Sequence, residues 1–200
     1  MNATGSIPAK MLNVLAVPGE VFEQVIAAPA NLANWRAPTL LTCLAALIAY
    51  YALPNDSWGA GEPLMGSVVV ISATIVGSVW TALVLWLIGR CCLKVRFSFR
   101  KSLEIAGLAG TIVALGHIGA VLLKLGFGSN ATPSLTLLAP GLPLNSGFRQ
   151  ALEVFNAFHL WTLAVLCIGL AKLARISVKE AGFWILGYWI LWRLALTVAA

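Results

Sequence analysis

Apolar residues run through this chain in five long stretches, at about residues 37–53, 64–89, 103–125, 154–171 and 182–199. A helix needs about 20 mainly apolar residues to cross a hydrocarbon core about 30 Å thick, and each stretch is close to that length. The pattern therefore predicts an all-α, polytopic integral membrane protein. We expect a five-helix transmembrane bundle over residues 36–200.

A different pattern marks the N-terminal segment, residues 1–35, in which no stretch is long enough to span a membrane. Pro18 suits the first position of a helix, and Glu20 falls in the first turn, where the helix dipole favours an acid. An apolar stripe at i, i+3 and i+4 spacing follows, formed by Val21, Phe22, Val25 and Ile26. We expect a short amphipathic helix here, which either lies on the membrane surface or packs under the bundle.

The basic residues gather in two of the connections between the apolar stretches. Of the 13 Lys and Arg residues, two precede the first predicted span and eight lie in these connections. Because short cytoplasmic loops are enriched in Lys and Arg, we expect a cytoplasmic N-terminus and a C-terminus outside. The candidate contacts for anionic headgroups or partner proteins on the cytoplasmic side are Arg90, Lys94, Arg96, Arg100, Lys101, Lys172, Arg175 and Lys179.

Composition agrees with a membrane protein: 60% of the residues are hydrophobic and 10% are charged. Soluble domains carry about a quarter charged residues. The net charge of +6 reflects the basic loops beside the spans, so we expect no nucleic-acid partner. The four cysteines lie in or beside the spans without the spacing of a zinc or redox pair, which favours apolar packing.

Helix-start signals follow both basic connections. Ser177 and Glu180 form an S-x-x-E capping box ahead of the fifth apolar stretch. Ser98 is placed to cap the third helix, and we expect Arg100 and Glu104 to pair at i, i+4 within it.

The third apolar stretch carries many small residues. Ala106 and Gly110, and again Gly116 and Ala120, form small-xxx-small pairs that allow helix backbones to approach closely. The pattern predicts the central helix of the bundle, with dimerisation as the alternative use.

Motifs for chemistry are missing from the sequence. It contains no H-E-x-x-H, no G-x-x-x-x-G-K and no G-x-S-x-G in a suitable context. We therefore expect no enzyme activity, no cofactor, and no catalytic, cofactor-binding or metal-binding residues.

Polar residues form one candidate layer within the bilayer. His117, His159 and Arg193 each lie roughly 9–12 Å below the outer ends of their predicted helices, and Asn156 shares a helix face with His159. A buried cation costs about 2.5 to over 10 kcal/mol, so such residues usually face the bundle or a cavity. The layer serves proton or solute handling, or else Arg193 snorkels to the headgroups and the histidines make local hydrogen bonds.

Three segments resemble the Yip family, the Ypt-interacting proteins and their bacterial relatives. The first is PGEVF at 18–22, followed by Pro29; the second is FNAFHLW at 155–161, continuing to IGL at 168–170. The third is the turn SFRKS at 98–102. The resemblance runs from about residue 11 to 195.

The resemblance implies a five-span helical bundle with a cytoplasmic N-terminus and no known catalytic residues. Eukaryotic members of the family bind Rab-type GTPases and shape secretory membranes, largely through a long cytoplasmic N-terminal region. Only some 35 residues precede the first predicted span here, which favours a bacterial relative in the cytoplasmic membrane.

These observations lead to two hypotheses for the function. The first is a non-enzymatic scaffold or adaptor that organises membrane lipids or partner proteins, with anionic headgroups, a partner protein or a second copy of the chain as its partners. The second is a small-solute or ion permease or channel that uses the polar layer.

Overall fold

The computed structural model describes residues 5–52, 63–128, 133–138, 152 and 155–199. Within these ranges the chain is helical, and its β pairing is limited to one isolated bridge between Ser134 and Asn156. The all-α prediction is therefore confirmed. The elements are α1 (Ile7–Ala16), α2 (Pro18–Ala27), α3 (Ala33–Ala52), α4 (Pro63–Leu87), η2 (Ile88–Cys92), α5 (Phe99–Phe127), η3 (Leu135–Leu138), α7 (Ala157–Ala174) and α8 (Val178–Ala199).

Three helical stretches in the described part of the chain are long and apolar enough to cross a membrane. They are α5, α7 and the continuous stretch Leu64–Cys92, formed by α4 and the π-helical turn η2. α3 and α8 occupy the positions of the first and fifth predicted spans, with 20 and 22 residues. The count of five spans stays a prediction. The connection between the third and fourth apolar stretches, at about residues 126–153, lies mostly outside the described residues.

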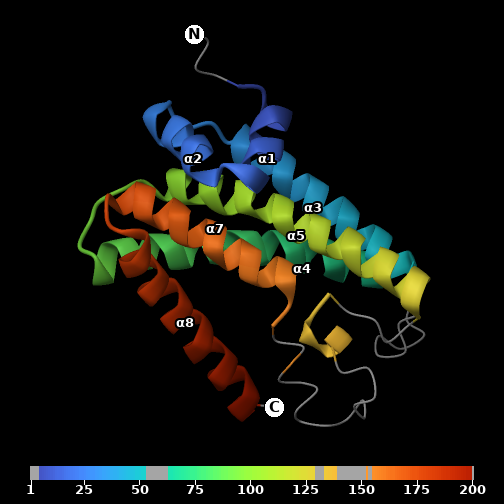
Figure 1. Ribbon diagram of the computed structural model, residues 1–200. Coiled ribbons are helices and arrows are strands. Elements are labelled where there is room, and N and C mark those ends of the chain that lie inside the picture. Colours follow the sequence, from blue (N-terminus) through green and yellow to red (C-terminus); the bar gives the residue numbers. More distant parts are fainter. Residues whose placement is uncertain (1–4, 53–62, 129–132, 139–151, 153–154, 200) are drawn as a thin grey trace.

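α5 is the central helix, as its small residues predicted. It contacts α1, α2, α3, α4 and α7, and Figure 1 shows these helices arranged around it. The backbones of α5 and α3 approach closely at Gly107, where an added methyl group would lie 2.6 Å from the Cα of Trp35. Farther along α5, Gly116 and Gly119 leave room for the ring of Phe158 on α7. Small residues thus let two neighbouring helices approach α5 closely.

α8 diverges from the other long helices and packs mainly along α7 (Figure 1). A hydrogen bond between two aromatic residues joins it to α4. The indole N–H of Trp80 on α4 donates to the hydroxyl of Tyr188 on α8 over 2.7 Å. Large apolar side chains on α8 remain exposed, including Phe183 at 72% and Leu191 at 68%. Such a surface suits contact with lipid chains.

The N-terminal segment forms two helices where the sequence predicted one. α2 starts at Pro18 and ends before Pro29, as predicted, but α1 precedes it and buries Val14. Phe22 is also fully buried and lies over Gly169 of α7. Of the two arrangements expected for the amphipathic helix, the structure shows packing against the bundle.

Both predicted helix caps are present. The Ser98 hydroxyl accepts the backbone N–H of Lys101 over 3.4 Å, and the Ser177 hydroxyl accepts that of Glu180 over 3.1 Å. The predicted pairing of Arg100 with Glu104 is wrong, because Glu104 pairs with Lys101 at 3.3 Å. Arg100 lies on the exposed side of α5, whereas Glu104 is fully buried under the N-terminal helices.

Candidate functional site

The four residues of the predicted polar layer line one cavity, of about 350 Å³, which we call the histidine cavity. His117 comes from α5, His159 from the first turn of α7, and Arg193 from α8. Asn156 is the N-cap of α7, and its side-chain oxygen accepts the backbone N–H groups of Phe158 and His159 over 2.9 and 3.3 Å. The structure therefore brings the four residues together and gives Asn156 a capping role.

Trp189 contacts both His159 and Arg193 in this cavity, and the sequence reasoning missed it. The His159 ring lies 5.7 Å from the Trp189 ring, centroid to centroid. The Cζ of Arg193 lies 5.9 Å from the same ring, a distance suited to a cation–π contact. The spacing i, i+4 between Trp189 and Arg193 on α8 was the available signal.

His159 keeps one unused polar atom. Its Nε2 is buried and has no hydrogen-bond partner among the described residues. A buried polar atom without a partner is uncommon in native structures, and a ligand or water is one of its ordinary explanations. Within the described chain, no group of three or more His, Cys, Asp or Glu side chains is arranged to hold a metal ion.

A second cavity, of about 400 Å³, adjoins the first and shares Val113, His117 and Thr162 with it. We call it the hydroxyl cavity, because hydroxyl side chains from α3 and α4 line it: Thr39, Thr42, Thr74, Ser78 and Thr81. The sequence analysis did not single out these residues. Their spacing was the missed signal, since Thr74, Ser78 and Thr81 recur at i, i+4 and i+7 on one helix face.

A buried polar group fastens the N-terminal segment to α5. The carboxylate of Glu104 accepts the backbone N–H of Asn31 over 3.2 Å and the side-chain amide of Asn34 over 2.7 Å, and it pairs with Lys101. We call these residues the Glu104 cluster. The ammonium of Lys101 also donates to two carbonyl groups at the end of α2, those of Val25 and Ala28, over 2.5 and 2.8 Å.

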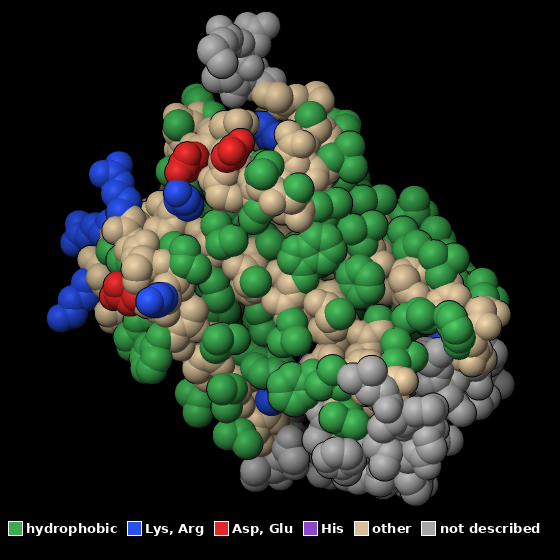
Figure 2. All heavy atoms as spheres, viewed as in Figure 1, with side chains coloured by type: hydrophobic (Ala, Val, Ile, Leu, Met, Phe, Trp, Pro, Cys, Tyr) green, Lys and Arg blue, Asp and Glu red, His purple; other side chains and the backbone are tan. Residues whose placement is uncertain are grey.

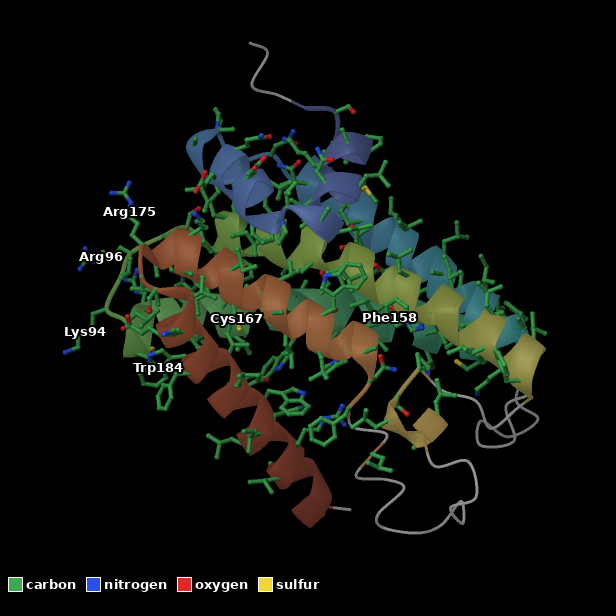
Figure 3. The ribbon with its side chains drawn as sticks, in the orientation of Figure 1. Lys94, Arg96, Phe158, Cys167, Arg175 and Trp184 are labelled. Carbon is green, nitrogen blue, oxygen red and sulfur yellow. The ribbon has the colours of Figure 1, made fainter. Side chains whose placement is uncertain are left out.

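Most of the predicted cytoplasmic contact residues project from one end of the bundle, which we call the basic end. Figure 3 shows Lys94, Arg96 and Arg175 pointing outward there, and Figure 2 shows Lys and Arg side chains gathered at the same edge. The exposed side chains of the basic end are Arg90, Lys94, Arg96, Arg100, Arg175 and Lys179.

Two of the predicted contact residues differ from the rest. Lys101 belongs to the Glu104 cluster, and its side chain is only 14% exposed. Lys172 forms an ion pair with Glu23 of α2, which ties α7 to the N-terminal helices. Both side chains are engaged in holding the N-terminal segment to the bundle.

Each basic connection turns at a basic residue with left-handed backbone. Lys94 has φ 55° after η2, and Arg175 has φ 56° at the C-cap of α7. Left-handed residues commonly end helices, because the turn lets following N–H groups reach the last carbonyls. After Arg175, the N–H of Ile176 donates to the Ala171 carbonyl over 3.1 Å. These turns direct the basic side chains away from the helix ends.

Comparison with known proteins adds a family and one bacterial relative. The membrane protein YknW of Bacillus subtilis (strain 168) is 27% identical over 138 residues, covering 64% of this chain and 59% of that protein. The chain thus spans less than two thirds of the relative's length. No solved structure matches the chain. The family model of the Yip1 domain matches residues 12–200, so the chain is a membrane protein that belongs to the Yip1 domain family.

Proposed function

We propose that this protein is a non-enzymatic scaffold or adaptor with five membrane spans, which organises membrane lipids or partner proteins through its basic end. The spans are α3, α4 with η2, α5, α7 and α8. At 1.5 Å per residue, the 20 residues of α3 extend about 30 Å, the thickness of the hydrocarbon core. Exposed apolar side chains on α3, such as Leu40 at 68%, favour contact with lipid.

The proposed orientation puts the basic end in the cytoplasm. This assignment follows the enrichment of Lys and Arg in short cytoplasmic loops. It places the N-terminal helices in the cytoplasm and the C-terminus outside. A bacterial cytoplasmic membrane is the proposed location, supported by the bacterial relative.

The observation that carries the proposal is the set of six exposed cationic side chains on the basic end. Near an anionic leaflet each Lys or Arg contributes about 1 kcal/mol of attraction. The N-terminal helices pack on the bundle, so their amphipathic face is not available to lie on the membrane surface. The basic end is therefore the proposed surface for contact with lipid headgroups or a partner protein. Anionic headgroups on the same leaflet are the proposed first partners.

Lipid retention tests the proposal. We expect a variant with Arg96, Arg100, Arg175 and Lys179 all changed to Gln to insert normally but to retain less anionic lipid. The protein would be purified from membranes containing phosphatidylglycerol, and bound lipids would be counted by native mass spectrometry. Lys124→Gln, at the other end of α5, is the matched control. Equal anionic lipid in the fourfold variant and the control would refute the proposal.

A second candidate function is favoured by the two adjoining cavities. A small-solute or ion permease needs a polar path within the bundle, and His117 lies where the cavities meet. In proteoliposomes this function requires solute flux that His159→Ala abolishes and that Glu20→Ala, on the exposed side of α2, leaves intact. Flux equal to that of protein-free vesicles would exclude it.

A further inference from the structure

We propose that the hydroxyl cavity is a binding site for a small uncharged solute that donates hydrogen bonds, such as a polyol. The proposed site shares His117 with the polar layer but is otherwise formed by other residues, and the proposal goes beyond the scaffold function. It extends the second candidate function by naming a ligand class. Because it concerns binding alone, it is tested without transport.

The first argument is the convergence of hydroxyl groups from separate helices. Thr39 and Thr42 share one face of α3, at i and i+3, while the hydroxyl face of α4 carries Thr74, Ser78 and Thr81. Both faces line the same cavity. The arrangement concentrates polar atoms in the middle of helices whose other faces are apolar.

The second argument is the hydrogen-bonding state of these hydroxyl groups. Four threonine hydroxyls donate to the carbonyl four residues earlier, over 2.8–2.9 Å: Thr42 to Pro38, Thr74 to Val70, Thr81 to Gly77 and Thr162 to Phe158. A hydroxyl has one hydrogen and two acceptor lone pairs, so an oxygen that has donated can still accept. These four hydroxyls therefore offer acceptor capacity, which suits a solute with N–H or O–H donors. The Ser78 hydroxyl already accepts the indole N–H of Trp35 over 2.9 Å and lies 3.4 Å from the Thr39 hydroxyl, so this pair keeps one hydrogen for a solute oxygen.

The third argument is charge. The described residues lining the cavity include no Lys, Arg, Asp or Glu, and His117 is their one ionisable side chain other than hydroxyl groups. Because a charge within a membrane bundle is costly without a partner, an uncharged guest suits this lining better than an ion.

Space and access also fit a small guest. The cavity volume of about 400 Å³ lies within the 300–1,000 Å³ typical of ligand sites. It exists because glycine and alanine line it, among them Gly77, where an added Cβ would meet no atom within 4 Å. Towards the basic end the core is filled by Ile105, Leu108 and Leu170, which are fully buried. Two lining residues of α4, Ala73 and Gly77, are exposed, so the cavity opens at the surface of that helix.

Saturation-transfer difference NMR on the full chain in nanodiscs tests the site, with erythritol as the probe and empty nanodiscs as the blank. We expect transfer to erythritol in the wild type. Gly77→Leu should abolish it, because the new side chain fills the cavity. Gly187→Leu, at another open helical glycine that does not line the cavity, should preserve it.

Hydroxyl deletion tests the chemistry. Thr81→Val keeps the side-chain shape but removes one acceptor, so erythritol should bind about two- to tenfold more weakly, the effect of one hydrogen bond. Thr111→Val, a buried threonine of α5 outside the cavity lining, is the matched control and should bind like the wild type. Absent transfer in the wild type, transfer that persists in Gly77→Leu, or stronger binding of butan-1-ol than of erythritol would each overturn the proposal.

Discussion

Glu104 is a fully buried carboxylate that joins parts of the chain far apart in the sequence. It contacts Asn31 and Asn34, which lie 73 and 70 residues earlier, as well as Lys101 one turn away. Burying a carboxylate costs several kcal/mol, and its partners must offset that cost. Glu104 has three of them, so it functions as the anchor of the N-terminal segment.

Replacing Glu104 should destabilise the protein strongly. Glu104→Ala removes one member of a buried ion pair, leaving the Asn34 amide without its acceptor and Lys101 without its counter-charge, which predicts a loss of about 3–5 kcal/mol. The measurement is the free energy of unfolding in mixed micelles titrated with a denaturing detergent. Glu20→Ala, at an exposed acid of α2, should change it by less than about 0.5 kcal/mol. Equal values for the two variants would contradict the anchoring role.

At the scale of one residue, sequence reasoning identified the caps but misassigned the partner of Glu104. The caps depend on local spacing, which the sequence displays directly. The partner depends on which face of α5 is covered by α2, and two basic residues, Arg100 and Lys101, lie at helical spacing from Glu104. Only the packing of the N-terminal helices distinguishes them.

At the scale of an element, α5 shows why glycine occupies its contact with α3. A methyl at Gly107 would lie 2.6 Å from the Trp35 Cα and 3.1 Å from the Asn34 carbonyl oxygen. Both atoms belong to backbone, so neither can move aside by a change of rotamer. The two helices must therefore separate to admit any side chain at this position.

Gly107→Ala should accordingly destabilise the bundle. In an exposed helix, Gly→Ala is worth about 1 kcal/mol in favour of the alanine. At Gly107 overpacking should reverse that sign, with a cost of about 1–3 kcal/mol. Gly187→Ala on α8, where a Cβ meets no atom within 4 Å, is the control and should be neutral or stabilising. Unfolding monitored by tryptophan fluorescence compares the two, and a stabilised Gly107→Ala variant would refute the close-contact account.

The long helices were predictable, but the packing of the short ones was not. A run of some 20 apolar residues has one ordinary explanation, a membrane span, so α4, α5 and α7 follow from the sequence. An amphipathic stripe such as that of Phe22 fits a lipid surface and a protein surface equally well. The cavities could not be predicted from the sequence for a related reason. Spacing shows that Thr74 and Ser78 share a helix face, but it does not show which other helices that face contacts.

At the scale of the whole molecule, the native cysteines report its orientation. Cys91 and Cys92 are exposed at the basic end, whereas Cys43 and Cys167 are buried. We expect a membrane-impermeant maleimide to leave intact cells unlabelled and to react after the inner face is opened. Cys91→Ser/Cys92→Ser should abolish this labelling. Labelling of Cys91 or Cys92 from outside would contradict the proposed orientation.

The contact of Phe22 with Gly169 has a consequence for biosynthesis. The two residues are about 150 positions apart, and a ribosome that adds 5–20 residues per second needs on the order of ten seconds to make that length. During this interval the apolar face of α2 has no α7 to cover it, so the nascent N-terminus must rest on lipid or a chaperone. Its packing against Gly169 can be completed only after α7 has been made.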